Sequence, residues 1–303
     1  MATADLWALR TLVAVADGGS FTAAAAALAT TQPAVSRQVG ALERRYGTQL
    51  FRRAARGVRP TPAGEVAIEQ ARQILARVAA MESQLRAFAG PDAGQVRLSA
   101  FPSANTALVP RAVRRFAGRY PGVAVSLLDV PSARAAHAVR DGELDLALIT
   151  GWDTASTAPH DGVELVPLPP DQLWVALPRD DPAASGEEVR LADLRDRTWI
   201  EGAHPDCLGP LTALRDALGG PPRTAYHCDD WNGKQALVAA GLGITLYPSV
   251  ALPCTHPGIV LRRPVPALPT RPLYAALPEP PFRLPATTHF LQTLTTEITG
   301  PPP

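Results

Sequence analysis

The chain is 303 residues long, which exceeds one ordinary domain and suits two or three. Hydrophobic residues make up 46% and charged residues 19%, a composition typical of a globular protein with a buried core. The net charge of +1 excludes no partner, because residues 1–90 carry 11 basic and 6 acidic residues, whereas the remainder carries 18 basic and 22 acidic residues. A basic head on a mildly acidic body indicates a polyanion-binding module joined to a second part.

The first residues and the cysteines predict a cytoplasmic protein. The segment before Arg10 lacks the basic start of a signal peptide, and the apolar stretch between Arg10 and Asp17 is too short for one. No run approaches the ~18 apolar residues that a membrane span needs. The three cysteines are an odd number at wide spacing, so no disulfide framework is expected.

The first 30 residues predict two helices of a helix-turn-helix. Apolar residues recur at helical spacing over Leu6–Ala16, and this helix should end at Gly18-Gly19. Ser20 is placed to cap a short second helix, Thr22–Leu28, which is dominated by alanine. Because alanine side chains are small, another helix can cross this one closely.

A third helix is expected after a turn at residues 29–31. Thr31 is placed to cap it, and Pro33 lies in its first turn, where a missing N–H costs nothing. The helix should stop at Gly47. Its buried side is expected to consist of Val35, Val39, Leu42 and Tyr46.

The other face of this third helix carries side chains that can read DNA. Gln32, Ser36 and Arg37 project from its first half, with Arg44 and Arg45 further along. Gln can bind adenine and Arg can bind guanine through paired hydrogen bonds, and Ser can bind bases or phosphates. In a helix-turn-helix the start of the second helix of the motif enters the major groove. These residues alone are equally compatible with a plain solvated face.

Residues 50–62 predict a wing. Leu50–Arg53 reads as a short strand, Arg56-Gly57 as a basic tip, and the residues up to Pro62 as a return strand. Arginines in such a wing lie along phosphates and add affinity without sequence information.

The head resembles the LysR-type transcriptional regulators in a long and collinear pattern. The matching residues are Ser20-Phe21-Thr22, Ala24-Ala25, Leu28, Gln32 to Val39, Leu42-Glu43, Gly47, Leu50 to Arg53 and Pro60 to Gly64. Two departures are the all-alanine second helix, where relatives usually carry charged residues, and Thr30, where an aliphatic residue is commoner. Both leave the helices in place and put flanking phosphate contacts in doubt.

The side-chain chemistry and the resemblance together predict the DNA contacts. The expected residues are Ser20, Thr22, Thr31, Gln32, Pro33, Ser36, Arg37, Arg52, Arg53, Arg56 and Thr61.

A long helix is expected between Gly64 and Gly90-Pro91. Small or apolar residues recur in alternating steps of four and three, which is a heptad seam that buries itself against a second helix. The seam consists of Ala67, Ala71, Ile74, Val78, Met81, Leu85 and Phe88. The alternative, a helix packed on its own domain, favours a broader stripe. The resemblance implies that this helix dimerises two chains.

The body alternates strands and helices, which predicts βαβ units and a parallel sheet. In the first half, strands are expected at Gln95–Ala100, Val123–Leu128 and Gly142–Ile149, with helices at 105–120 and 133–140. In the second half, strands are expected at 173–177, 198–200, 243–246 and 273–277, with helices at 208–218 and 233–240.

The expected fold is an all-α winged helix-turn-helix with a long linker helix, followed by a two-lobed α/β domain that resembles periplasmic binding proteins. The resemblance to the family continues in Gly118–Val123, Gly142–Leu148 and Gly241–Ile244. The expected domains are 1–62, 63–90 and 91–303, with lobe I at about 91–165 and 268–303 and lobe II at about 166–267. The Pro-rich segments Glu164–Pro167 and Val265–Arg271 are expected to cross between the lobes.

Ligands of such folds bind in the crevice beyond the carboxyl ends of the strands. The residues expected there are Phe101, Ser103, Asn105, Thr150, Glu201, His204 and Trp231. Ser103 and the helix amides after it can hold a carboxylate, although Ser103 also fits a simple helix cap. His204 and Trp231 also fit packing or capping. An acid such as Glu201 in the crevice disfavours a dicarboxylate and favours a polar, amino-bearing or neutral aromatic effector.

Catalytic and metal chemistry find little support. Cysteine and histidine lie close together at three places, His204 with Cys207, His227 with Cys228, and Cys254 with His256. However, CxxC, HExxH and GxSxG motifs are absent from the sequence, and the glycines near Gly241 and Gly233 do not form a nucleotide-binding pattern. We therefore expect no enzyme, no cofactor and no metal.

A LysR-type regulator of transcription explains the basic head, the seam and the crevice together. Its expected partners are double-stranded promoter DNA, a small-molecule effector and further copies of itself in a dimer or tetramer, with RNA polymerase as a further candidate and no membrane. The alternative is a sensor resembling a solute-binding protein, with redox or metal input through the cysteines and histidines.

Overall fold

The computed structural model describes residues 5–54, 57–87, 94–152, 162–202, 211–280 and 283–299. The chain divides at Glu82–Ser83 into an N-terminal and a C-terminal compact unit. Within the described residues, no helix is both long and apolar enough to cross a lipid bilayer.

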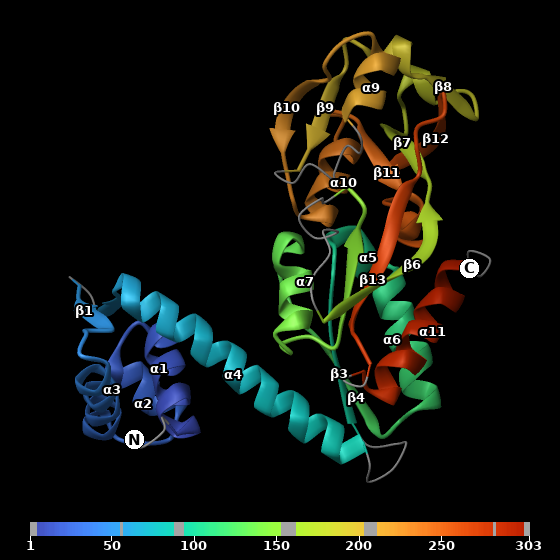
Figure 1. The fold of residues 1–303 in the computed structure, drawn as a ribbon. Coiled ribbons are helices and arrows are strands. Elements are labelled where there is room, and N and C mark those ends of the chain that lie inside the picture. The colour runs from blue at the N-terminus through green and yellow to red at the C-terminus, as the bar shows by residue number, and fades with distance from the viewer. Residues whose placement is uncertain are drawn as a thin grey trace. The chain divides into compact units, whose positions relative to one another are not determined.

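The N-terminal unit begins with three helices, α1 (Leu6–Gly18), α2 (Phe21–Ala27) and α3 (Gln32–Tyr46), which pack side by side (Figure 1). Ser20 caps α2 as predicted, since it accepts a hydrogen bond from the Ala23 amide at 3.1 Å, and Asp5, which was not predicted as a cap, accepts one from the Ala8 amide at 2.7 Å. The core residues of this bundle are Ala8, Leu12, Val15, Ala24, Ala25, Val35, Val39 and Leu42.

Two predictions for α3 were wrong in detail. Thr31 occupies the N-cap position, but its side chain makes no capping hydrogen bond. Tyr46, expected on the buried side, is 53% exposed. It lies in the last turn, beside the left-handed Gly47 that ends the helix, where the buried stripe of α3 has already ended at Leu42.

The wing is an antiparallel pair of strands, β1 (Phe51–Arg53) and β2 (Val58–Pro60). Glu43 of α3 holds its base, because the Glu43 carboxylate accepts hydrogen bonds from the amides of Leu50 at 2.8 Å and Phe51 at 3.3 Å. Gly57 has a φ of +81°, and a Cβ there would lie 2.1 Å from the carbonyl oxygen of Gly19. A glycine is therefore required for the wing to pack against the turn between α1 and α2.

Helix α4 (Pro62–Ala87) starts inside this unit. Gly64 in its first turn packs on Leu50 so closely that a Cβ would lie 1.9 Å from the Leu50 carbonyl oxygen. Ile68 and Ala71 belong to the core of the unit, and Arg72 forms an ion pair with Asp17 of α1. Of the predicted seam, Ala67 and Ala71 thus pack within this unit, and only the residues from Ile74 onward are available to contact a second helix. Phe88 lies outside the described residues.

Replacing Ser20 with Ala should destabilise the start of α2. The substitution removes the acceptor of the Ala23 amide and should cost about 1 kcal/mol. Hydrogen exchange of a peptide that covers α2 should become faster by a factor of about five, while Ser20→Thr, which keeps the oxygen, should exchange nearly as slowly as the original protein. Equal exchange in the Ser20→Ala and original proteins would contradict the capping role.

Lobe I of the C-terminal unit is a three-layer α/β/α structure. Its sheet has the order β4-β3-β5-β13-β6. The strands are β3 (Gly94–Ala100), β4 (Val123–Leu127), β5 (Leu146–Thr150), β6 (Val163–Asp171) and β13 (Arg271–Pro278). One face is covered by α5 (Pro102–Thr106), α6 (Leu108–Arg119) and α11 (Pro285–Thr299), and the other by α7 (Ser132–Arg140) (Figure 1). The sheet is mixed, since β13 runs antiparallel to both β5 and β6.

Lobe II contains a four-stranded sheet of order β11-β7-β12-β8 and a parallel pair, β9 and β10. Its strands are β7 (Leu173–Pro178), β8 (Glu188–Arg190), β9 (Thr198–Glu201), β10 (Arg223–His227), β11 (Thr245–Pro248) and β12 (Ile259–Val265). Its helices are α9 (Leu211–Leu218), α10 (Trp231–Ala239) and the 3-10 segments η1 (Pro182–Ala184), η2 (Leu191–Leu194) and η4 (Ser249–Cys254). The cores on the two sides of the sheet contain Trp199 and Tyr247 respectively. The expectation of a parallel sheet is therefore met only in part, because β9–β10 and β8–β12 pair in parallel whereas β7 pairs antiparallel with both β11 and β12.

The first crossing between the lobes lies later in the chain than predicted. The segment Glu164–Pro167 is not a crossing but part of β6, which pairs with β13 as far as Asp171. Prolines in this stretch suggested a linker, but β6 is an edge strand, where a missing N–H can face outward. Lobe I therefore extends to Asp171, and the chain enters lobe II at Leu173. The second crossing, between Val265 and Arg271, lies where it was predicted.

Helices in the body also differ from the prediction at one important place. The expected helix 105–120 is broken at Ala107 into α5 and α6. Helix α5 begins directly after β3 with Phe101 at the N-cap, so Ser103 lies in its first turn and is not the cap that the sequence also allowed. The strands β8, β10 and β12 and the helix α11 were not predicted.

Candidate functional sites

The exposed face of α3 presents the predicted reading residues together. Gln32, Ser36 and Arg37 are exposed, as are Arg44 and Arg45 in the second half of the helix. Arg37 has no acidic partner among the described residues. This face can therefore offer hydrogen-bond donors and positive charge to a partner without first breaking an internal ion pair.

Further predicted residues surround this face. Thr22, Thr31 and Pro33 are exposed near the starts of α2 and α3. Ser20 is half-buried and engaged in capping α2. Thr61 is also engaged, because its hydroxyl donates to the Gln49 carbonyl at 2.7 Å and accepts from the Gly64 amide at 3.0 Å. Its role in the structure is to start α4.

The wing adds a second group of cations. Arg52 and Arg53 are exposed on β1, and Arg59 faces Arg52 across the strand pair. None of the three forms an ion pair within the described part of the chain. Arg59 lies in the predicted return strand but was not among the predicted DNA contacts, and Arg56 lies outside the described residues.

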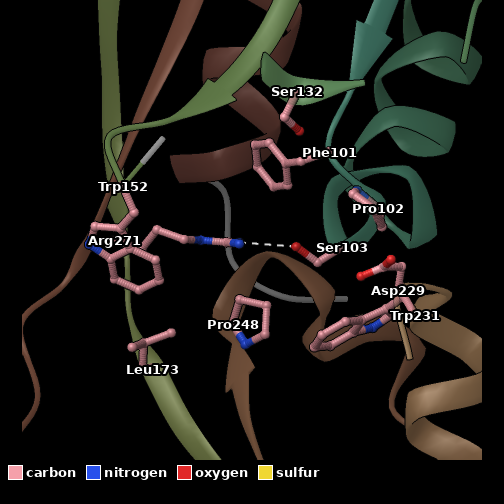
Figure 2. Close-up of a pocket in the computed structure, with 10 residues that line it drawn as sticks. All are labelled: Phe101, Pro102, Ser103, Ser132, Trp152, Leu173, Asp229, Trp231, Pro248 and Arg271. Atoms are coloured by element: carbon pink, nitrogen blue, oxygen red, sulfur yellow. Dashed lines mark hydrogen bonds between the residues drawn. The ribbon is translucent and has the colours of Figure 1, made fainter. Parts of the chain in front are cut away.

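A pocket lined by residues of both lobes lies between them, and Figure 2 shows its lining. The walls are mainly aromatic and apolar, with a few polar groups. The lining residues are Phe101, Pro102, Ser103, Ser132, Trp152, Leu173, Asp229, Trp231, Pro248 and Arg271. Such a lining, with few convergent polar groups, is typical of small-molecule sites.

Arg271, which the sequence did not single out, is the central polar residue of this pocket. It is 5% exposed, and its Nη2 donates to the Ser103 hydroxyl at 3.1 Å (Figure 2). Its Nε and Nη2 also donate to Asp171 Oδ2, at 3.0 and 2.5 Å. The guanidinium carbon lies 4.7 Å from the Phe101 ring centroid and 6.0 Å from that of Trp152, so the planar cation is held between rings.

Asp171 connects this cation to lobe II. Its side chain is fully buried, and Oδ1 accepts from the Ser249 hydroxyl at 2.5 Å and from the Val250 amide at 3.0 Å. One network thus joins Ser103 of α5, the end of β6, the start of β13 and η4 of lobe II. A ligand that changes the partners of Arg271 can therefore favour one arrangement of the lobes over another.

Trp231 forms another side of the pocket and rests on a buried tyrosine. It is the first residue of α10, and its ring packs edge-on against Tyr247 at 5.1 Å. Burial raises the pKa of the Tyr247 phenol, whose oxygen lies 3.2 Å from Gln235 Oε1 and 3.1 Å from the Ala251 carbonyl oxygen. Lys234 is buried beneath, with its ammonium 5.7 Å from the Trp231 ring centroid.

The structure brings together only some of the predicted crevice residues. Phe101, Ser103 and Trp231 line the pocket. Asn105 lines an adjoining hollow, and its amide nitrogen donates to the Ala100 carbonyl at 3.0 Å. Thr150, at the end of β5, is buried in the sheet and is not among the lining residues.

Glu201 is not among the described lining residues either. It ends β9, where it pairs with His227 of β10, and its carboxylate is 3.4 Å from the Thr224 hydroxyl. The acid that does line the pocket is Asp229. The prediction of an acid in the crevice therefore applies to a different residue, because β9 points its last side chain toward β10. His204 lies outside the described residues.

The cysteine and histidine clusters do not converge in the described structure. Cys228 Sγ donates to the Asp230 carbonyl and Cys254 Sγ to the Thr106 carbonyl, both at 3.3 Å. Among the described residues, no three potential metal ligands lie together. Cys207 lies outside them.

The comparisons with known proteins agree with this architecture. Residues 6–65 match the sequence model of the bacterial regulatory helix-turn-helix protein, lysR family, and residues 89–299 match that of the LysR substrate binding domain. The regulator TfdS of Cupriavidus pinatubonensis is 31% identical over 80% of this chain and 81% of its own length. The small neutral protease regulatory protein of Streptomyces coelicolor is 34% identical over 78% of this chain and 71% of its own length.

A solved structure is similar over nearly the entire chain. The crystal structure of full-length CbnR complexed with its target DNA is 25% identical, covers 97% of this chain and 99% of its own, and has a TM-score of 0.76. The chain belongs to the LysR family of transcriptional regulators. It is a DNA-binding regulator with an effector domain of the substrate-binding type, and this family consists of regulators of transcription and not of enzymes.

Proposed function

We propose that α3 enters the major groove of a promoter and reads base edges with Gln32, Ser36 and Arg37. The observation that carries this proposal is the exposed Arg37, which has no ion pair among the described residues, beside two exposed polar side chains on one helix face. Thr22, Thr31 and Pro33 would lie near the phosphates at the helix starts, and Ser20 would act through the cap that orients α2. Arg52, Arg53 and Arg59 would follow the phosphates.

We also propose the functional division and assembly of the chain. Residues 1–62 bind DNA, residues 63–90 join two chains through the part of the seam that begins at Ile74, and residues 91–303 respond to an effector. A dimer or tetramer places two heads on one site, as the exposed apolar side chains of α4 suggest. We place the protein in the cytoplasm with its promoter, with RNA polymerase as a further partner.

The pocket around Arg271 is the proposed effector site. A small molecule bound there would contact lobe I through Ser103 and lobe II through Trp231. It can change promoter binding only by binding one arrangement of the lobes better, typically by about 1–3 kcal/mol.

Arg37→Ala should abolish most of the sequence discrimination of the protein. A side chain that reads a base contributes about 1–3 kcal/mol of discrimination between base pairs. Arg52→Ala and Arg53→Ala should instead weaken binding to the operator and to random DNA by the same factor, because these arginines would contact phosphates. The operator is first obtained by selecting bound duplexes from a random pool. Gel shifts on that operator and on random DNA at two salt concentrations then give the ratio of affinities.

The matched control is Arg190→Ala, which removes an exposed arginine of lobe II and should change neither affinity. An unchanged ratio of specific to random affinity in Arg37→Ala would overturn the assignment of α3 as the reading helix.

A further inference from the structure

The polar end of the interlobe pocket is the guanidinium of Arg271, whose positive charge is balanced by the carboxylate of Asp171. Two nitrogens of Arg271 are bound to Asp171, and the pair is buried, so a ligand meets hydrogen-bond donors without a full positive charge. None of the hydrogen bonds within the described residues uses Nη1 of Arg271. Because guanidinium donors lie in one plane, an oxygen acceptor in that plane fits them best.

The remaining charge of the lining disfavours a second anionic group. Arg271 and Asp229 are the charged side chains among the described lining residues, and the adjoining hollow adds Asp129 and Asp230. A ligand with one acceptor group can turn it to Arg271 and Ser103. A second carboxylate would instead face carboxylates, which repel it.

The walls favour a flat, apolar body. Phe101 is already covered on one face by the guanidinium at 4.7 Å, which leaves Trp231, Pro248 and Leu173 as the surface for a ligand (Figure 2). Leu173 and Pro248 are paired across β7 and β11, so this side of the pocket is held by a sheet. A rigid planar ring gains contact with such walls while losing little conformational freedom.

We infer that the effector is a small planar aromatic compound with a single sp² oxygen acceptor group, a carboxylate or an amide, and that Arg271 binds that oxygen. This inference rests on the proposed function, because it names the ligand class of the proposed effector site. Asp171 is a positioning residue, since it holds the guanidinium in place through two nitrogens and is itself held by Ser249 and Val250.

The test compares four probes on the full-length protein by ligand-observed NMR titration. Benzoate and benzamide share the ring and the oxygen group and differ in charge. Cyclohexanecarboxylate keeps the carboxylate and loses the planar ring, and terephthalate adds a second carboxylate. Benzoate and benzamide should bind, and the other two should bind at least about fivefold more weakly than benzoate.

The critical variant is Arg271→Gln with Asp171→Asn, which removes the donor fork and leaves no buried charge uncompensated. The matched control is Arg97→Gln with Asp145→Asn, which neutralises another largely buried Arg–Asp pair of lobe I, held at 2.8 Å and outside the pocket. Thermal melts of both variants test that they are folded before any ligand is added. The pocket variant should bind benzoate and benzamide at least about tenfold more weakly, and the control should bind them as the original protein does.

Three results would overturn the inference. These are equal benzoate affinity in the pocket variant and the original protein, tighter binding of terephthalate than of benzoate, or no binding of either aromatic probe up to about 20 mM. If one of benzoate and benzamide binds more tightly than the other, the inferred ligand class still holds. The tighter binder then shows whether the oxygen group of the effector is a carboxylate or an amide. Operator binding without ligand is measured on the same samples, so failure of the ligand class is distinguished from failure of the proposed regulator.

Discussion

Asp171→Ala should lower the free energy of unfolding of the C-terminal unit by about 3–5 kcal/mol. The substitution leaves the guanidinium of Arg271, 5% exposed, without its counter-ion in a pocket of low dielectric. It also removes the acceptor of the Ser249 hydroxyl and the Val250 amide, which tie η4 to the crossing strands.

Urea unfolding monitored by tryptophan fluorescence measures this effect. The double variant Arg271→Gln with Asp171→Asn should recover most of the lost stability, because it leaves no charge unpaired. Arg190→Ala, at an exposed pair with Asp193, serves as a control and should change stability by less than about 1 kcal/mol. A loss below about 1 kcal/mol in Asp171→Ala would show that the pair is solvated and not buried.

Met81→Asp with Leu85→Asp should separate the proposed dimer. Both side chains lie on the seam of α4 and are 52% and 60% exposed within one chain, so a second helix can cover them. If a second helix covers them, two carboxylates at this contact would be buried without partners. The dissociation constant of the dimer should then rise about 100-fold or more, and operator binding should fall with it.

Sedimentation of the full-length protein and gel shifts on the selected operator measure the two effects. Val66→Asp is the matched control, because Val66 is 66% exposed on the same helix but does not lie on the seam. This control should keep both the assembly and the DNA affinity. An unchanged sedimentation coefficient in the double variant would show that α4 does not join the chains.

The elements that depend on neighbouring residues could be predicted from the sequence alone. Ser20 caps α2, Gly47 ends α3, and the two strands of the wing lie where the sequence indicates them. In each case the signal and its partner are a few residues apart, so the backbone conformation follows from local hydrogen bonds and sterics. The resemblance to the LysR family rests on the same local patterns, which is why the class of protein was correctly predicted.

The tertiary structure decided the polar centre of the pocket. Arg271 is 100 residues from Asp171 and 168 from Ser103 in the chain, and the three meet only because β13 returns to lie beside β6. The proline-rich segment Glu164–Pro167, which was predicted to link the lobes, is part of the edge strand β6. The side chain of Glu201 faces β10, and the acid that lines the pocket is Asp229. Helical and strand periodicity shows which residues are buried, but it contains no information on which charge, far away in the chain, compensates a buried cation.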